Sequence, residues 1–572
     1  MNRYHTFQEI KYKTLMIFLI LLIMFSIPTY AQIQTDVPHL KDVYKNDFYF
    51  GCLLSYAHIG FPTDPPVPGQ SNVVDPNGGY LIQFHMNSMG PGNWMKSAYI
   101  VDINGSASAY NLAGTQIEKD SIDVHPIITF NGNIIAQLNW AQRQGFTFRG
   151  HTLVWHNQTP GTAFFRSGYT SNGTRLSKEK MTQRMENFIK EVIRIIHESW
   201  PGLLSAFDVV NEAVNDNGTD RTASEWYETF GDNSYIMKAF EFARNYTILY
   251  NETQIKLYYN DYNTSNPQKA DGIVRICGPI FQAGFLDGIG MQEHDQLVSP
   301  TADQWITSYN KFDTICTEMS VTELDVNPGS GTPTPSVLQT QANQFAMLFK
   351  CFMDRSYRSG RGKIVSVTKD GLNDQWTFIA NSSLWDSNDQ CKPAFYAVAD
   401  VGINYNMLDS LIAFADSLNE EDYTPQSWSD FIEALTSGVN AIEQNYTNSI
   451  SAADALGEAK DNLQAAIDGL VLITTDVDDI ASKSPKVFLL NQNYPNPFNP
   501  TTQISYSIPQ NGYISLKVYD LLGMEIATLF EGILLAGNYV VSFDGSEIAS
   551  GIYLYRLKAN NFIETKKLIL LK

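Results

Sequence analysis

Two short runs of strand-forming residues each end in a carboxylate. Residues 207–213 read Phe-Asp-Val-Val-Asn-Glu-Ala, so Asn211 and Glu212 close a run typical of a buried parallel strand. Residues 315–326 follow the same pattern and carry Glu323. In a β/α barrel, polar residues at this end of a strand point into the active site. Two such carboxylates are the minimum for hydrolysing a glycosidic bond, whereas either one alone would be interpreted as a solvated loop residue.

These two strands belong to a repeating strand–helix pattern, which predicts an α/β fold of the (β/α)8 TIM-barrel type. Residues 60–80 are rich in Pro, Gly, Asp and Asn and are expected to form an irregular loop, and residues 97–130 are expected to be an insertion without a clear period. The predicted strands are 48–54, 80–84, 145–155, 207–212, 256–263, 288–294, 315–326 and 364–368, and the predicted helices are 134–144, 178–198, 233–247 and 338–355.

The pattern changes after the predicted barrel. Apolar residues recur at helical spacing in three stretches, which predicts a small three-helix bundle at 404–472. Residues 473–486 are rich in Thr, Asp, Ser and Lys and are expected to be a linker. Short alternating runs broken by glycines predict a β-sandwich at 487–572. The barrel itself is predicted to occupy residues 40–402.

The N-terminus has the features of a secretory signal peptide. Lys11 and Lys13 precede an apolar run at 15–27, and the small residues before Ala31 favour cleavage there, so residues 1–31 are predicted to be removed. A membrane anchor is the alternative, but the run is short for a spanning helix.

Composition excludes some classes of function. The net charge of −21 argues against nucleic acid and against an anionic membrane surface as partners. The five cysteines are too few for a disulfide framework, and their spacing fits no metal motif. Whether any of them pair is left open by the sequence.

Five segments of the predicted barrel carry distinctive polar residues. They are Arg-Gly-His-Thr-Leu-Val-Trp-His at 149–156, Asp-Val-Val-Asn-Glu-Ala at 208–213, Asn-Asp-Tyr-Asn at 260–263, Gly-Ile-Gly-Met-Gln-Glu-His at 288–294 and Thr-Glu-Leu-Asp at 322–325. In this order and at this spacing they resemble glycoside hydrolase family 10, the xylanase family, over about residues 40–402. The resemblance implies retaining hydrolysis of β-1,4-xylan, and since two carboxylates suffice, no cofactor and no metal are expected.

The resemblance also implies roles for individual residues. Glu323 corresponds to the nucleophile and Glu212 to the acid/base, which must carry a proton to donate to the leaving oxygen. His294 corresponds to a hydrogen-bond partner of the nucleophile, with Asp325 supporting it. Asn211 corresponds to the donor to the sugar 2-hydroxyl. The other residues that match substrate-binding groups of the family are His151, Trp155, Gln292, Asn93 and Lys96.

Structural alternatives remain for some of these residues. Trp155 is expected either to stack on a sugar or only to pack in the core, and the sequence favours neither alternative. One of His151 and His156 is expected to be a core histidine. Asn260 and Asp261 either contact substrate or cap the following helix.

Three positions depart from the family pattern. Gly92 replaces a Glu, Ser97 replaces a Trp, and Asp370 replaces the sugar-stacking Trp of a Thr-x-Trp-Gly motif. Trp376 is then either the second aromatic of that region or a substitute for the missing one. These changes fall on the donor side of the implied site, so we expect them to alter substrate preference rather than the acid/base pair.

Two further resemblances lie beyond the barrel. Residues 423–428, Tyr-Thr-Pro-Gln-Ser-Trp, resemble a FIVAR-type module, which is either a sugar-binding appendage or a stiff spacer. Residues 490–502, 518–523 and 549–555 resemble the C-terminal sorting domain of Bacteroidetes type IX secretion. This resemblance implies the type IX secretion machinery as a partner and a secreted or cell-surface location.

The sequence thus predicts a secreted, modular endo-1,4-β-xylanase that acts as a monomer on xylan or xylo-oligosaccharides. Two alternatives remain. The first is a xylan-binding surface protein with weak or lost turnover, and the second is a related β-glycanase with altered donor-side specificity.

Overall fold

The computed structural model describes residues 33–54, 77–447, 451–473 and 485–572, except 522, 535, 560 and 561. The predicted signal peptide, most of the loop predicted at 60–80 and most of the predicted linker lie outside these residues. Within them, no helix is both long enough and apolar enough to cross a membrane.

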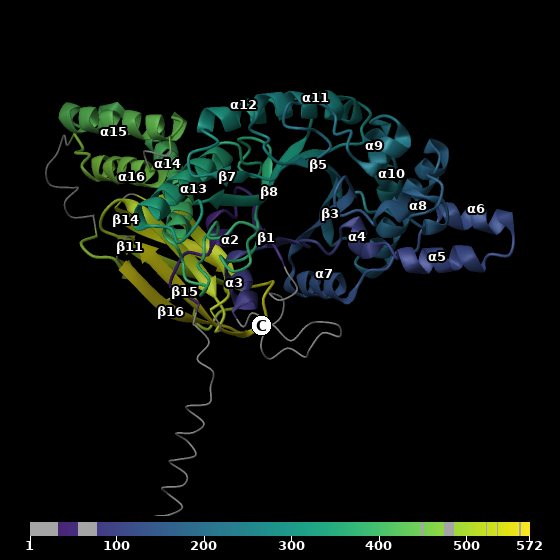
Figure 1. The fold of residues 1–572 in the computed structure, drawn as a ribbon. Coiled ribbons are helices and arrows are strands. Elements are labelled where there is room, and N and C mark those ends of the chain that lie inside the picture. Colours follow the sequence, from purple (N-terminus) through teal and green to yellow (C-terminus); the bar gives the residue numbers. More distant parts are fainter. Residues whose placement is uncertain are drawn as a thin grey trace, which may run out of the picture. The chain divides into compact units, whose positions relative to one another are not determined.

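A closed ring of parallel strands forms the centre of the first part of the chain (Figure 1). The sheet has nine strands, of which β7 only extends it beside β8, and the pairings of β1 with β9 and of β6 with β8 close the ring. This confirms the predicted (β/α)8 barrel. The strands are β1 (Tyr49–Leu53), β2 (Ser88–Gly90), β3 (Thr147–Trp155), β4 (Leu204–Asn211), β5 (Lys256–Asp261), β6 (Gly288–Met291), β7 (His294–Gln296), β8 (Glu318–Asn327) and β9 (Ile364–Lys369).

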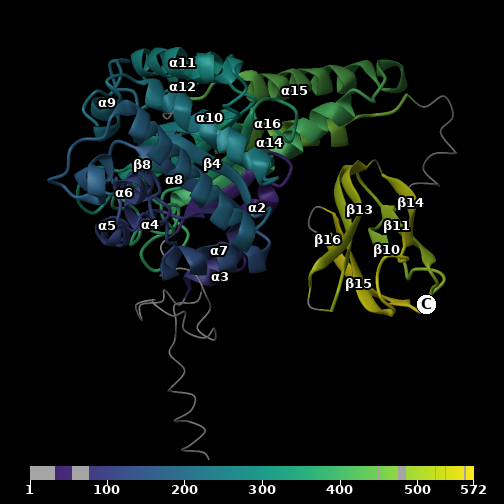
Figure 2. The ribbon, with the colours of Figure 1, turned by 90° about the vertical axis from the view of Figure 1, so that its right-hand side faces the viewer.

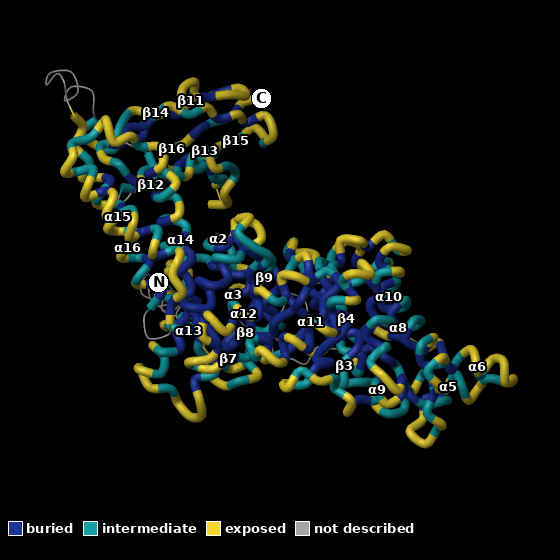
Figure 3. Tube along the Cα trace, turned by 90° about the horizontal axis from the view of Figure 1, so that it is seen from above, coloured by how far each residue is buried: buried dark blue, intermediate teal, exposed yellow. Residues whose placement is uncertain are grey.

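The barrel strands are buried on both faces, as expected for a parallel sheet covered by helices (dark blue in Figure 3). The short strand β6 contributes two glycines, which leave room for large side chains of β5. A Cβ at Gly288 would collide with the Tyr258 ring, and one at Gly290 would collide with the Asn260 amide. The glycines of β6 therefore allow Asn260 to occupy the end of the barrel.

Helices surround the ring and follow most strands. In α8, the buried face consists of Met181, Arg184, Met185, Phe188, Ile189, Val192, Ile193 and Ile196. The helices up to the end of the barrel are α2 (Leu40–Val43), α3 (Gly78–His85), α4 (Ser97–Ile100), α5 (Ile103–Leu112), α6 (Gln116–Val124), α7 (Gly132–Gln144), α8 (Lys178–Ser199), α9 (Glu225–Phe230), α10 (Ser234–Leu249), α11 (Pro267–Gln282), α12 (Ala302–Phe312), α13 (Pro335–Met353) and α14 (Pro393–Ala415).

The strand predicted at 80–84 is wrong, because these residues lie in α3. Leu81, Ile82 and His85 are buried there, a spacing that suits one face of a helix. The second strand of the barrel is instead β2, three residues with none of the usual strand formers. The insertion predicted at 97–130 contains α4, α5 and α6, and α6 begins at a capping box formed by Thr115 and Glu118.

The described cysteines make no disulfide. Four of the five are buried, and only Cys391 is partly exposed. They behave as small apolar residues of the core.

Three helices form the predicted bundle after the barrel: the second half of α14, α15 (Pro425–Glu443) and α16 (Ala452–Asp468). At Gly438 of α15, a Cβ would lie 3.1 Å from Leu408 and 3.4 Å from Leu463, so the three helices meet there. The proposed boundary between barrel and bundle, at 402–404, lies within the unbroken helix α14.

The C-terminal residues form two antiparallel sheets (yellow in Figure 2). Buried side chains from both sheets share one core, which includes Ile504, Leu516, Val518, Tyr555 and Leu557, so the predicted β-sandwich is confirmed. One sheet has β10 (Leu489–Leu490), β11 (Thr501–Ile508) and β14 (Gly537–Asp544), and the other has β13 (Glu525–Leu534), β12 (Gly512–Tyr519), β15 (Gly551–Ala559) and β16 (Phe562–Leu570).

Candidate active site

A cavity of about 790 Å³ opens at the C-terminal ends of the barrel strands. Loops after β1, β2, β3, β4, β5 and β9 and residues of β7 and β8 contribute to its wall, as expected for the active end of a β/α barrel. The residues that line it are Leu53, Leu54, Gly92, Asn93, Trp94, Lys96, His151, Trp155, Asn157, Gln158, Glu212, Tyr262, Gln292, His294, Glu323, Asp370, Gly371, Trp376, Thr377 and Phe378.

Glu212 is the first residue after β4. Its φ of 55° is unusual for a residue with a side chain, and its backbone NH donates to the Asn260 carbonyl at 2.9 Å. Its Oε2 accepts a hydrogen bond from Trp155 Nε1 at 3.0 Å, and its Oε1 accepts one from Gln292 Nε2 at 3.0 Å. Two neutral donors from β3 and the end of β6 therefore fix the carboxyl group in the cavity wall.

Glu323 projects into the same cavity from β8. Its Oε1 accepts a hydrogen bond from Asn260 Nδ2 at 3.0 Å, and its Oε2 lies 3.6 Å from His294 Nε2. Burial works against the charge of Glu323, but the contact with His294 and the positive charges of His151, His294 and Lys96 outweigh it and lower the pKa of Glu323 to about 2. Glu323 is therefore an ionised carboxylate at all ordinary pH values.

His294 lies between two carboxylates. Its Nδ1 is 3.2 Å from the fully buried Asp325, and its Nε2 faces Glu323. Burial disfavours the imidazolium, but the hydrogen bonds with Asp325 and Glu323 outweigh it and raise the pKa of His294 to about 11. The protonated imidazole thus donates to Asp325 and forms an ion pair with Glu323.

An amide network joins the two glutamates. Asn260 Nδ2 donates to Asn211 Oδ1 at 3.0 Å as well as to Glu323, and Gln292 Nε2 donates to Asn211 Oδ1 at 3.3 Å as well as to Glu212. Thr322 Oγ1 in turn donates to Asn260 Oδ1 at 2.7 Å. Asn260 therefore neither caps a helix nor lines the cavity. It holds Asn211 and Glu323 in register, while Asn266 caps α11.

His151 is anchored from behind by a buried carboxylate. Its Nδ1 is 2.9 Å from Asp208 Oδ2, and Arg149 Nε donates to the same oxygen at 3.1 Å. His151 lines the cavity, whereas His156 does not, although His156 Nδ1 lies 3.9 Å from Glu212 Oε2. Burial first, then the charge of Arg221, lowers the pKa of His156 to about 4. The expectation that one of the two is a core histidine is not met by His156, whose side chain is 23% exposed against 6% for His151.

Lys96 brings a cation to the other wall. Its Nζ donates to Asn93 Oδ1 and Gln158 Oε1, each at 2.7 Å, and lies 4.6 Å from the centre of the Trp155 ring. Burial lowers the pKa of Lys96, which the carboxylates of Glu323 and Glu212 partly offset. Trp155 is thus neither a purely structural residue nor a simple platform, because it holds Glu212 and faces Lys96.

Two of the three positions that depart from the family pattern reach the cavity, whereas Ser97 is buried in α4 and does not line it. Gly92, Asp370 and Trp376 line it, together with Phe378, whose side chain is 86% exposed. Lys369, next to Asp370, is fully buried, and its Nζ has no hydrogen-bond partner within the described chain. Burial lowers the pKa of Lys369 to about 8.

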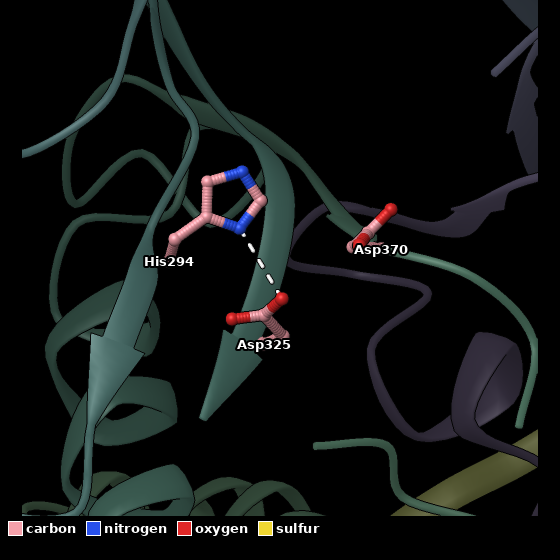
Figure 4. Close-up of side chains that lie close together, drawn as sticks. All are labelled: His294, Asp325 and Asp370. Atoms are coloured by element: carbon pink, nitrogen blue, oxygen red, sulfur yellow. Dashed lines mark hydrogen bonds and ion pairs between the residues drawn. The ribbon is translucent and has the colours of Figure 1, made fainter. Parts of the chain in front are cut away.

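Figure 4 shows His294, Asp325 and Asp370, whose nearest ligand atoms lie within 4.8 Å of one another. Such a group could in principle hold a cation. However, His294 donates to Asp325 and faces Glu323, and a protonated imidazole has no free lone pair for a metal. We therefore describe the group as a network of charges around a histidinium.

The structure brings the sequence-predicted residues together. All of them line the cavity except Asn211 and Asp325, which contact residues that do. Sequence reasoning missed Trp94, Gln158, Tyr262 and Phe378 as wall residues. Tyr262 lies within a recognised motif, but nothing in the local sequence marks Phe378.

Comparisons with known proteins agree with this geometry. The sequence model of glycosyl hydrolase family 10 matches residues 39–401, and that of the secretion system C-terminal sorting domain matches residues 492–571. The latter directs the chain to the cell surface or the extracellular space.

Curated relatives and solved structures carry the same description. Endo-1,4-β-xylanase Y of Acetivibrio thermocellus is 36% identical over 382 residues, which cover 63% of this chain and 32% of that protein. Endo-1,4-β-xylanase B of Butyrivibrio fibrisolvens is 31% identical over 396 residues, or 68% of this chain and 56% of that protein. This chain therefore spans only about a third of the length of the first relative and somewhat over half of the length of the second. The structure of the endo-1,4-β-D-xylanase 10B modules of Clostridium thermocellum with xylohexaose is 31% identical, with a TM-score of 0.53 over 63% of this chain and 67% of that one.

Proposed function

Because the chain belongs to glycosyl hydrolase family 10, we propose that it is a secreted endo-1,4-β-xylanase that cleaves internal bonds of xylan with retention of configuration. The observation that carries the proposal is the pair of glutamates at the barrel end. An ionised Glu323 and a carboxyl group at Glu212, held by two neutral donors, face one cavity and are joined through Asn211 and Asn260. A nucleophile beside an acid/base is what retaining hydrolysis needs.

In the first step, the Glu323 carboxylate attacks the anomeric carbon of the sugar on the donor side. The bond to the leaving oxygen breaks, and Glu212 donates its proton to that oxygen. The product is a glycosyl ester on Glu323 and a shorter chain that leaves. Trp155 and Gln292 act by holding the Glu212 carboxyl where the leaving oxygen lies.

In the second step, Glu212 is a carboxylate and removes a proton from water. The water oxygen attacks the anomeric carbon, the ester bond breaks, and Glu323 leaves as a carboxylate. His294 stabilises that departing charge, and Asp325 keeps His294 protonated. Asn211 donates to Glu212 at 3.4 Å and is joined to Glu323 through Asn260, and its proposed role is to donate to the sugar 2-hydroxyl.

The parts of the chain beyond the barrel have proposed roles in secretion and in substrate binding or spacing. We propose that the sorting domain engages the type IX secretion machinery and that the enzyme works as a monomer on xylan or xylo-oligosaccharides. Two further units are proposed, the barrel at 40–402 and the FIVAR-like bundle at 404–472. The bundle is either a spacer or a sugar-binding appendage.

The test is release of reducing sugar from a panel of xylans and β-glucans, comparing wild type with Glu323→Ala. A matched control is Glu318→Gln, at the opposite end of the same strand, where the carboxyl accepts a hydrogen bond from Tyr258 Oη at 2.6 Å. We expect release from xylan by wild type and by the control, and none from Glu323→Ala.

Two other outcomes would change the proposal. Asp370 and Gly92 in the cavity wall favour, as a second candidate, a β-glycanase with a different main chain, which would release sugar from another glycan and still depend on Glu323. Binding to xylan without release from any glycan would make the chain a binding protein and overturn the enzymatic proposal.

A further inference from the structure

Asp370 presents an unused acceptor to the active-site cavity. One of its oxygens, Oδ2, accepts a hydrogen bond from the Phe378 backbone NH at 3.1 Å and so holds the loop that carries the exposed Phe378. Among the described residues, no side chain or backbone NH donates to its other oxygen, although Asp370 forms part of the cavity wall. A substrate hydroxyl is a donor that this oxygen can accept.

The charges around Asp370 are nearly balanced. Asp325 and Glu323 are the carboxylates that act on it most strongly, and His294 is the cation that acts on it most strongly. Lys96, across the cavity, and the buried Lys369 also interact with Asp370. Burial and the neighbouring carboxylates raise the pKa of Asp370 to about 6, so at neutral pH Asp370 is a carboxylate that adds negative charge to this wall of the cavity.

We propose that Asp370 is a specificity-determining residue that makes the donor side of this cavity select neutral xylan chains over chains bearing uronic acid side groups. The inference rests on the proposed xylanase function and adds a substrate preference to it. The Asp370 carboxylate weakens the attraction of Lys96 and His294 for an anionic substituent and repels a uronate that comes close to it.

Burial also supports this role. Asp370 is partly buried, so its interaction with another charge is screened less than at an open surface.

The experiment compares glucuronoxylan with the same polymer after chemical reduction of its uronic acids to neutral hexoses. The two substrates share a backbone and a substitution pattern and differ in charge. The variant is Asp370→Asn, because its amide oxygen still accepts from the Phe378 NH while the charge is lost. Asp370→Ala removes both the charge and that hydrogen bond. Asp271→Asn is the matched control, since Asp271 is an exposed carboxylate of α11 paired with Lys311 outside the cavity.

We expect wild type to prefer the reduced polymer, and Asp370→Asn to lower this preference in kcat/KM by about fivefold, the size expected for one partly screened charge pair. High salt should lower the preference of wild type in the same direction, which requires no variant. Asp271→Asn should keep the wild-type preference.

The proposal is overturned if wild type cleaves both polymers equally at low salt, or if its preference is the same in Asp370→Asn and at high salt. A change seen in Asp370→Ala but not in Asp370→Asn would also overturn it, because the loop and not the charge would then be responsible. Hydrolysis of linear xylohexaose by wild type tests the proposed function separately: its absence sinks the xylanase, whereas its presence with no discrimination sinks only the role of Asp370.

Discussion

At the scale of single residues, the charge of Glu323, the proposed nucleophile, depends on a histidinium. The pKa of Glu323 is about 2 because its contact with His294 and nearby positive charges outweigh burial, and the pKa of His294 is about 11 because two carboxylates flank it. Glu323 thus contributes stability that is fully present above its unfolded pKa and lost as the pH falls toward 2. His294 contributes stability that is present below its unfolded pKa and lost as the pH rises toward 11.

Replacing His294 by Gln should therefore move the acid limb of the pH profile. Gln can still donate a hydrogen bond to Glu323 but carries no charge, so the pKa of Glu323 should rise and the acid limb of kcat/KM on xylan should shift upward by about one to two pH units. The control is His197→Gln. His197 lies in the last turn of α8, does not line the cavity and pairs with Glu252. An unchanged acid limb in His294→Gln would contradict the account.

The sequence predicts the residues at this scale well, because each strand end carries a short polar motif. It does not predict how they are connected. Asn260 was expected to cap a helix or to touch substrate, yet it bridges Asn211 and Glu323, because two neighbouring strands place their ends at the same height. Phe378 reaches the cavity from a long loop, and loops carry no periodicity from which a position can be inferred.

At the scale of elements, the loop after β9 depends on one glycine. Gly371 has a φ of 66°, and a Cβ there would collide with the backbone of Trp376. Gly371→Ala should therefore displace Trp376 from the cavity wall as well as incur the cost of the left-handed backbone, about 1–2 kcal/mol. We expect a raised KM for xylan together with a lower Tm.

The matched control is Gly284→Ala after α11. Gly284 has a similar φ of 77°, but a Cβ there would meet nothing within 4 Å. It should lower the Tm by a similar or smaller amount and leave the KM unchanged. Equal KM values for the two variants would show that the Gly371 contact does not position Trp376.

The sequence predicts most elements of the barrel because apolar residues recur with the period of a strand or a helix. It fails at the start of the barrel for a physical reason. Residues 80–84 are mostly apolar or aromatic, which suits a strand, but they bury a helical face in α3, while β2 is too short to be recognised. Parallel pairing with β1 and β3 makes Ser88–Gly90 a strand, and that pairing is a tertiary effect.

At the scale of the whole molecule, the proposed catalytic site and the sorting domain belong to separate cores. The sandwich has its own buried cluster, and all residues of the candidate site lie within the family match at 39–401. A chain that ends at residue 473 should therefore still hydrolyse xylan in cell extracts but should no longer be secreted from the cell. Loss of activity in the purified truncated chain would contradict this separation.

The domain boundary proposed from the sequence lends itself to a second truncation. A chain that ends at 403 would cut the continuous helix α14 and leave the buried Val401 in a frayed last turn. We expect its Tm to fall by several degrees below that of the chain ending at 473. The composition indicates a change of fold near residue 404. The composition does not show that the single helix α14 continues across this boundary.

The most direct test of the central claim is the configuration of the first product. Proton NMR of xylohexaose during its hydrolysis by wild type resolves the two anomers before they equilibrate. Attack by Glu323 followed by attack of water inverts the anomeric carbon twice, so the β anomer should form first, and Glu323→Ala should form none. Initial formation of the α anomer would contradict a nucleophilic role for Glu323 and require a single displacement by water.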